Sequence, residues 1–257
     1  MLGLYDSGLG GLTVLRALRA AAITQDIVYF ADQAHSPYGD KTETEIAGYL
    51  RDNLALLASQ DVDAVVTACN TSCAIAQKLG WPETPFPVLD IITSAGRAFA
   101  GTPHRRIAVV ATAATVRSGA YARAIRVAAP HAEIAEIAAP ALVPIVERGE
   151  AEQPIARDAV AAVVAGLPRD VDAIVYGCTH YPLLDRWFGE ALGPHVARID
   201  PAAAQAAATA KLVAERGLPP GTSTTAYYTN GDAAAFERAV RRWTADPAGR
   251  VAALIAR

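Results

Sequence analysis

Two cysteines that end matching strings of residues are the strongest candidates for chemistry in this sequence. Residues 61–71 read DVDAVVTACNT and residues 170–180 read DVDAIVYGCTH; the strings agree at six positions and carry Cys69 and Cys178 in the ninth place. A thiol acts as a base through its thiolate, and its reference pKa of about 8.5 lies near neutrality. Two thiols from two copies of one unit indicate one site built from two half-sites, although each cysteine alone would also suit a buried strand.

Acidic, basic and hydroxyl side chains lie at the ends of other apolar strings. Asp6 and Ser7 follow LGLY, and His180 stands two residues after Cys178. A protonated histidine stabilises a thiolate, whereas a charged carboxylate opposes it. We therefore expect His180 to assist Cys178, and Asp6 to accept or relay a proton near Cys69. Capping or packing is the alternative role for both residues.

The elements that must position these residues alternate between strand and helix patterns. The sequence predicts strands at 2–6, 26–31, 88–92, 133–137 and 224–232, within each cysteine string and from 106. It predicts helices at about 12–22, 42–60, 141–150, 152–165, 201–216 and 233–243. Such alternation implies parallel sheets covered on both faces, with the thiols at the carboxyl edge where α/β sheets bind ligands. We expect Asn70 and Thr71 to cap the helix after Cys69, and Cys73 to pack in the core.

Duplication of a half-domain accounts for the repeated cysteine string and predicts the domain organisation. We expect an α/β fold of two pseudo-symmetric doubly wound lobes with mainly parallel sheets and a cleft between them. One lobe would comprise residues 1–95 plus 206–257, and the other residues 96–205.

Composition excludes several other classes of protein. The 257 residues are 52% apolar and 19% charged, which is typical of a soluble globular protein. A net charge of −3 offers no basic surface to nucleic acid, and no run of about 18 apolar residues predicts a membrane span. The odd count of three cysteines argues against a secreted disulfide framework, and no signal peptide is visible. We expect a cytoplasmic protein.

With these motifs in hand, the chain resembles the glutamate racemases of the cofactor-independent aspartate/glutamate racemase superfamily. The matching stretches are DSGLGGLTVLRAL, YFADQAHSPYG, ACNTS, GCTHYPLL and YYTNGD, which span most of the chain in the family's order. The sequence departs from the family's pattern at Ser72-Cys73 and at His35-Ser36.

The resemblance implies a role for each matching residue. Cys69 and Cys178 correspond to the two catalytic acid/base thiols, Asp6 assists the first, and Glu147 and His180 lie beside the second. The residues implied in substrate binding are Asp6, Ser7, Tyr38, Gly39, Asn70, Thr71, Thr112, Thr115, Ser118, Thr179 and His180. It also implies a homodimer that takes glutamate and supplies D-glutamate for peptidoglycan, cell-wall biogenesis and cell shape.

Racemisation by this chain is expected to need no cofactor and no metal. Pyridoxal phosphate would require a Schiff-base lysine, and none of the three lysines (Lys41, Lys78 and Lys211) follows an apolar strand. Donors at the strand ends and a cleft closed to water would stabilise the carbanion instead.

Other functions remain open from the sequence. An aspartate racemase or another racemase of the superfamily would use the same thiols, whereas a decarboxylase relative keeps only one. A metal or redox protein would use Cys69, Cys178 and His180 as ligands. A two-lobed binding module would hold glutamate without exchanging its α-proton.

Overall fold

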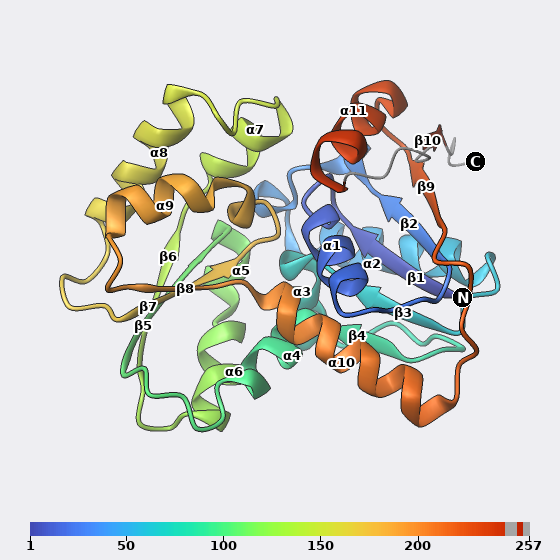
Figure 1. Ribbon diagram of the computed structural model, residues 1–257, viewed down its shortest axis with the longest axis horizontal. Coiled ribbons are helices and arrows are strands. Elements are labelled where there is room, and N and C mark those ends of the chain that lie inside the picture. Colours follow the sequence, from blue (N-terminus) through green and yellow to red (C-terminus); the bar gives the residue numbers. More distant parts are fainter. Residues whose placement is uncertain (245–250, 254–257) are drawn as a thin grey trace.

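The computed structural model of this chain describes residues 1–244 and 251–253 and contains two parallel sheets with helices around them (Figure 1). The order in the first sheet is β10 (Val251–Ala253), β9 (Thr225–Thr229), β2 (Ile27–Ala31), β1 (Leu2–Asp6), β3 (Ala64–Thr67), β4 (Val88–Asp90). The order in the second sheet is β6 (Glu133–Ala138), β5 (Arg106–Ala111), β7 (Ala173–Gly177), β8 (Ala197–Ile199). Each pair of neighbouring strands is parallel.

The two sheets repeat one strand order, which confirms the predicted fold class. The series β2-β1-β3-β4 corresponds to β6-β5-β7-β8, so β3 and β7, which precede the two cysteines, occupy equivalent places. Of the strands that the structure describes, β9 and β10 are those without a counterpart in the second sheet. The sequence did not predict β8 and β10, which are three residues long; β4 has the same length but was predicted as the strand at 88–92.

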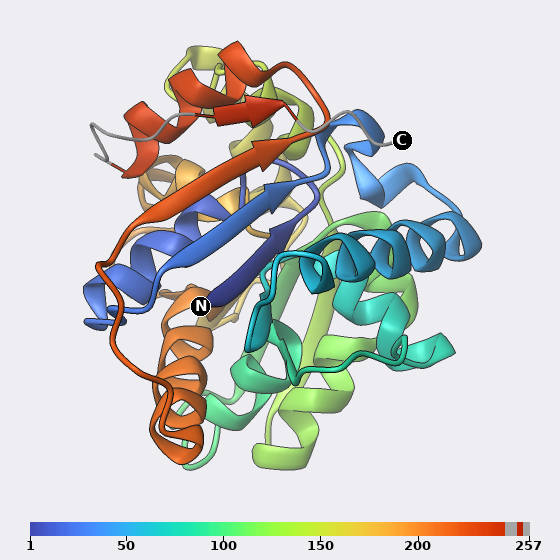
Figure 2. The same ribbon diagram turned by 90° about the vertical axis from the view of Figure 1, so that its right-hand side faces the viewer.

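Helices cover both faces of the first sheet because successive side chains of its strands point in opposite directions (Figure 2). Leu4 of β1 belongs to the apolar cluster that includes α1, whereas its neighbour Tyr5 belongs to the cluster that includes α2. The α-helices are α1 (Leu12–Ala20), α2 (Glu43–Ala58), α3 (Asn70–Leu79), α4 (Ile91–Ala98), α5 (Ala113–Ser118), α6 (Ala120–Ala128), α7 (Leu142–Glu147), α8 (Pro154–Ala165), α9 (Asp185–Leu192), α10 (Pro201–Arg216) and α11 (Ala233–Thr244). Short 3₁₀ helices are η1 (Gln33–His35), η2 (Tyr38–Asp40) and η3 (Tyr181–Leu184).

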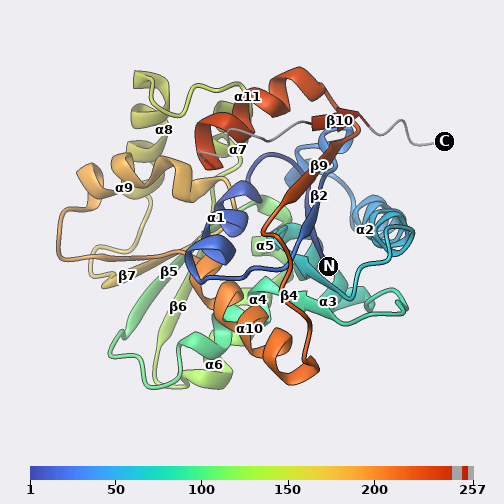
Figure 3. The ribbon, with the colours of Figure 1, turned by 45° about the vertical axis from the view of Figure 1, so that its right-hand side comes forward.

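Helices α4 and α10 join the halves of the molecule. Figure 3 shows both helices near the lower centre of the molecule; α10 packs against α4 and α1, and α4 packs against α6. The first sheet draws its strands from residues 2–90 and 225–253, and the second from residues 106–199. The domain boundaries given above remain predictions, and residues 245–250 and 254–257 of the predicted first lobe lie outside the described part of the chain.

Local signals explain where the clearest helices begin and end. Thr42 and Glu45 form a capping box at the start of α2, which stops the helix from extending further back. The Asp200 carboxylate accepts the Ala202 N–H at the start of α10, and Gly217 adopts a left-handed conformation at its end. Among the described residues, no helix has the length and apolar character needed to cross a membrane.

Candidate active site

Both cysteines lie where a strand ends and a helix or turn begins. Cys69 follows β3 and caps α3 itself, because its Sγ accepts the Ser72 N–H at 3.5 Å. The expectation that Asn70 or Thr71 caps this helix is therefore wrong: both are already inside its first turn. Cys178 follows β7, and both cysteines are buried and free of disulfides.

The environment of Cys69 favours a protonated thiol. Burial and the nearby Asp6 carboxylate raise the pKa of Cys69 to about 12, against opposing hydrogen bonds from Ser72 and Ser7. Burial likewise raises the pKa of Asp6 to about 6, although the charge on His180 and a hydrogen bond from Thr179 work against it. Asp6 can thus hold a proton near neutrality, as a group that relays protons must.

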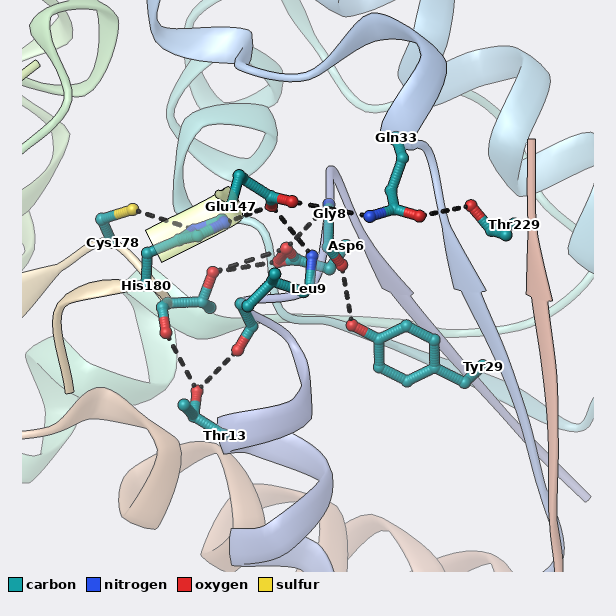
Figure 4. Close-up of polar contacts among 12 residues, drawn as sticks. Asp6, Gly8, Leu9, Thr13, Tyr29, Gln33, Glu147, Cys178, His180 and Thr229 are labelled. Carbon is teal, nitrogen blue, oxygen red and sulfur yellow. Dashed lines mark hydrogen bonds and ion pairs between the residues drawn. The ribbon is translucent and has the colours of Figure 1, made fainter. Parts of the chain in front are cut away.

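His180 contacts Cys178 on one side and the carboxylate of Glu147 on the other (Figure 4). His180 Nδ1 lies 3.6 Å from Cys178 Sγ, and His180 Nε2 lies 2.6 Å from Glu147 Oε1. Burial favours neutral imidazole, but the contacts with Cys178 and Glu147 prevail and raise the pKa of His180 well above its usual value. Burial also opposes a charged Glu147, yet the hydrogen bond and charge of His180 lower its pKa. The pair is therefore an ion pair that places positive charge beside the Cys178 sulfur.

Hydrogen bonds between the lobes join the two half-sites. Thr179, next to Cys178, donates from Oγ1 to Asp6 Oδ2 at 3.1 Å. The Leu9 N–H donates to Glu147 Oε1 at 3.1 Å. Gly10 lies so close to the second lobe that a Cβ at this position would contact Thr179 Oγ1 and His180 Nδ1. The glycine-rich turn after β1 thus permits close approach of the two lobes.

The threonines and Asn70 form a second polar contact between the lobes. Thr71 Oγ1 lies 3.0 Å from Thr112 Oγ1, and Thr112 Oγ1 lies 2.9 Å from Thr115 Oγ1. The Tyr121 hydroxyl donates to Asn70 Oδ1 at 2.5 Å. Together with the contact between Asp6 and Thr179, these hydrogen bonds bring together predicted site residues of β1, of α3, of α5 and of the segment after β7.

Three further predicted residues have partners of their own. The Ser118 hydroxyl donates to the Thr115 carbonyl at 2.6 Å and accepts the Ala120 N–H at 3.1 Å, so it closes the end of α5. The Tyr38 hydroxyl donates to the buried Asp32 carboxylate and accepts a hydrogen bond from the Tyr5 hydroxyl at 3.0 Å. Gly39 packs against Thr112, where a Cβ would lie 2.9 Å from the threonine Cβ.

Sequence reasoning missed three residues that support the site. Asp32 accepts hydrogen bonds from Tyr38 and from Asn53 Nδ2, the latter at 3.1 Å, and so anchors the segment that carries Tyr38. Its position directly after β2, like that of Asp6 at the end of β1, was an available signal. Tyr121 and Gln33 carried no comparable signal, because their partners are remote in sequence.

The structure also bears on the role of Cys73 and on the metal alternative. Cys73 is fully buried in the apolar core, as predicted. Among residues 1–244 and 251–253, no three His, Cys, Asp or Glu side chains are grouped to hold a metal ion.

Comparisons by sequence and by structure both find glutamate racemases among the similar proteins. A sequence model for Asp/Glu/hydantoin racemases matches residues 12–209. A glutamate racemase of Gloeobacter violaceus is 42% identical over 252 residues, which are 95% of this chain and 92% of that protein.

Two crystal structures extend the similarity to nearly the whole chain. A glutamate racemase of Bacillus anthracis superposes with a TM-score of 0.91 at 26% identity, covering 99% of this chain and 97% of that one. A glutamate racemase of Francisella tularensis, crystallised with D-glutamate, superposes with a TM-score of 0.87 at 26% identity and the same coverage.

Proposed function

Since this chain belongs to the Asp/Glu/hydantoin racemase family, we propose that it is a glutamate racemase that interconverts L- and D-glutamate. The choice of glutamate rests on relatives such as the Gloeobacter protein, whose names specify this substrate, and on the D-glutamate in the Francisella crystal. The product would supply D-glutamate for peptidoglycan, and hence for cell-wall biogenesis and cell shape.

The reaction needs one base and one acid on opposite faces of the α-carbon. A thiolate removes the α-proton and becomes a thiol, while the opposite thiol delivers its proton and becomes a thiolate. Each turnover therefore leaves the two sulfurs with exchanged protonation states. The observation that carries this assignment is the equivalence of Cys69 and Cys178, which follow corresponding strands in two sheets of the same order.

Each thiol has its own proton partner. In the first half-site, Asp6, with a pKa of about 6, takes up or returns the proton of Cys69. In the second, the cationic His180 stabilises negative charge on Cys178 and is itself held by Glu147. The ammonium group of bound glutamate adds positive charge near Asp6 and so weakens the repulsion that disfavours a thiolate at Cys69.

The carbanion that develops at the α-carbon is stabilised without an electron-sink cofactor. We propose that hydroxyl and amide groups of Asn70, Thr71 and Thr179 donate hydrogen bonds to the α-carboxylate, where negative charge accumulates. Loss of one such donor is expected to cost a factor of roughly 10²–10³ in rate. None of the three lysines follows a strand, so no side chain is placed to form a Schiff base with pyridoxal phosphate.

Exchange of the α-proton with solvent tests the proposal. Purified protein in D₂O without added cofactor should convert L-glutamate to deuterated D-glutamate, and the reverse. Cys69→Ala and Cys178→Ala should each stop racemisation, whereas Cys73→Ala, which removes the thiol buried in α3, should retain it. Turnover of aspartate but not glutamate would change the proposed substrate from glutamate to aspartate. Binding of glutamate without exchange of its α-proton would contradict racemase activity altogether.

The family resemblance also suggests the assembly and location of the enzyme. We propose a homodimer in the cytoplasm. Sedimentation of the purified protein as a monomer at micromolar concentration would contradict the dimer.

A further inference from the structure

The segment Thr229-Asn230-Gly231 at the end of β9 has no role in the proposed reaction, yet it holds η1 against the cleft. The Thr229 hydroxyl lies 2.9 Å from Gln33 Oε1, and Asn230 Oδ1 accepts the Ala34 N–H at 2.9 Å. Gly231 packs so closely that a Cβ there would lie 2.6 Å from Gln33 Cβ. This segment therefore determines where the Gln33 side chain points.

The hydrogen bonds of Thr229 also fix which end of the Gln33 amide faces the second lobe. Thr229 Oγ1 accepts the Gly231 N–H at 3.0 Å and donates its own hydrogen to Gln33 at 2.9 Å. The atom that receives it must be an acceptor, so the carbonyl oxygen of the amide faces Thr229. The NH₂ group of Gln33 then points to the second lobe, where Nε2 lies 3.5 Å from Glu147 Oε2 (Figure 4).

Glu147 is held by donors from both lobes. Its Oε1 accepts hydrogen bonds from His180 of its own lobe and from the Leu9 N–H of the first lobe. Its Oε2 accepts from Gln33, and both side chains line a cavity of about 320 Å³. Without Gln33, this oxygen would face the cavity, and the carboxylate plane could rotate away from His180.

We propose that Gln33, oriented by Thr229, is a positioning residue that fixes Glu147 against His180 when the two lobes are closed, so that the proton chemistry of Cys178 depends on a side chain of the opposite lobe. This inference rests on the proposed racemase function. It assigns a role to YYTNGD, whose threonine and glycine orient and accommodate Gln33. Gln33 touches neither thiol in this arrangement and acts only through Glu147.

Isotope effects distinguish such positioning from a general structural role. For a racemase the equilibrium constant is 1, so a defect lowers kcat/KM equally in both directions. If the Cys178 step becomes slower, however, the α-deuterium isotope effect rises for the enantiomer whose proton Cys178 removes and falls for the other. A merely structural defect changes both isotope effects alike. His180→Asn and Asp6→Asn serve as references, since they impair the second and the first half-site respectively.

The variants follow from the geometry. Gln33→Ala should lower kcat/KM by about tenfold, as expected for a hydrogen bond to a carboxylate, and shift the isotope effects in the direction of His180→Asn. Gln33→Glu keeps the length of the side chain but places a second carboxylate beside Glu147, so kcat/KM should fall further than in Gln33→Ala. Thr229→Val frees the amide to reverse and should give the same isotope asymmetry. Thr225→Val, at the other end of β9, should leave the kinetics unchanged.

The outcomes separate the inference from the function on which it rests. Failure of the wild-type protein to exchange the α-proton of glutamate contradicts the racemase assignment. Suppose instead that the wild-type enzyme racemises glutamate. The role of Gln33 alone is then contradicted if Gln33→Ala and Thr229→Val are unimpaired, or if they are impaired and both isotope effects change equally. An isotope asymmetry in the direction of Asp6→Asn would also overturn it, because it would place Gln33 in the Cys69 half-site.

Discussion

Thr179 of the second lobe donates a hydrogen bond to Asp6 of the first, with 3.1 Å between Thr179 Oγ1 and Asp6 Oδ2. This contact connects the residue beside one thiol with the acid that assists the other. Asp6 is fully buried, and burial raises its pKa to about 6.

The first prediction concerns the pH dependence of stability caused by Asp6. Folded Asp6 keeps its proton up to about pH 6, whereas an unfolded aspartate loses it near 3.9, so the folded state binds more protons between these values. Its contribution to stability is therefore complete below about pH 4 and is lost as the pH rises to about 6. Asp6→Asn should become more stable relative to wild type by roughly 3 kcal/mol over this range.

Urea unfolding at several pH values from 4 to 7 measures this difference. Asp26→Asn is the matched control, because hydrogen bonds from Thr224 and Thr222 lower the pKa of Asp26 to about 2, outside the tested range. A difference between Asp6→Asn and wild type that does not vary with pH would contradict the buried, protonated state of Asp6.

The second prediction tests the close approach of the glycine-rich turn. Gly10→Ala would place a methyl group against Thr179 and 2.6 Å from His180 Nδ1, so both side chains must shift. A displacement of this kind should lower kcat/KM by about 100-fold. Gly48→Ala in α2 is the control: its Cβ would have only Arg51 nearby, at 4.0 Å, and the better helix propensity of alanine should stabilise the protein by about 1 kcal/mol. Equal values of kcat/KM for the two variants would show that the glycine-rich turn can move to accommodate the methyl group.

The third prediction concerns the ion pair of His180 with Glu147. Because these partners raise the pKa of His180, the stability it contributes is complete below its unfolded pKa of about 6.5 and is lost as the pH rises through the higher folded value. His180→Asn should be less stable than wild type by about 3 kcal/mol at pH 6, and the difference should shrink toward pH 9. Chemical unfolding at both pH values measures it. His104→Asn is the control: it removes a longer contact, at 3.6 Å to Asp172, and its free energy of unfolding should differ little from that of wild type. If the loss of stability in His180→Asn is the same at pH 6 and pH 9, the charged pair is excluded.

Local signals in the sequence predicted most elements and the two half-sites. The bounds 201–216 for α10 agree with the structure because Asp200, Pro201 and Gly217 mark both ends. The equivalence of β3 and β7 could be predicted because duplication left two nearly identical strings around the cysteines. In both cases neighbours along the chain determine the outcome.

Contacts between the lobes could not be predicted, because they depend on how the halves pack. Gln33 and Glu147 are 114 positions apart, and no periodicity or motif relates them. Nor does sequence pattern reveal that the Tyr38 hydroxyl turns to Asp32, or that Ser118 closes α5. The type of a residue thus shows what its side chain can bind, whereas the neighbouring groups determine where that side chain points.

The last prediction tests whether the second lobe positions Asn70. The Tyr121 hydroxyl of α6 donates to Asn70 Oδ1 at 2.5 Å, and both side chains are buried. Tyr121→Phe removes the donor and leaves the amide oxygen unpaired, which should cost about 1–3 kcal/mol, shared between stability and substrate binding. We therefore expect kcat/KM for glutamate to fall about tenfold. Tyr176→Phe loses a comparable hydrogen bond, at 2.7 Å to Asp185, which is not among the predicted site residues. Steady-state kinetics that decline equally in both variants would contradict a specific role for Tyr121, because only Tyr121 contacts a proposed substrate-binding residue.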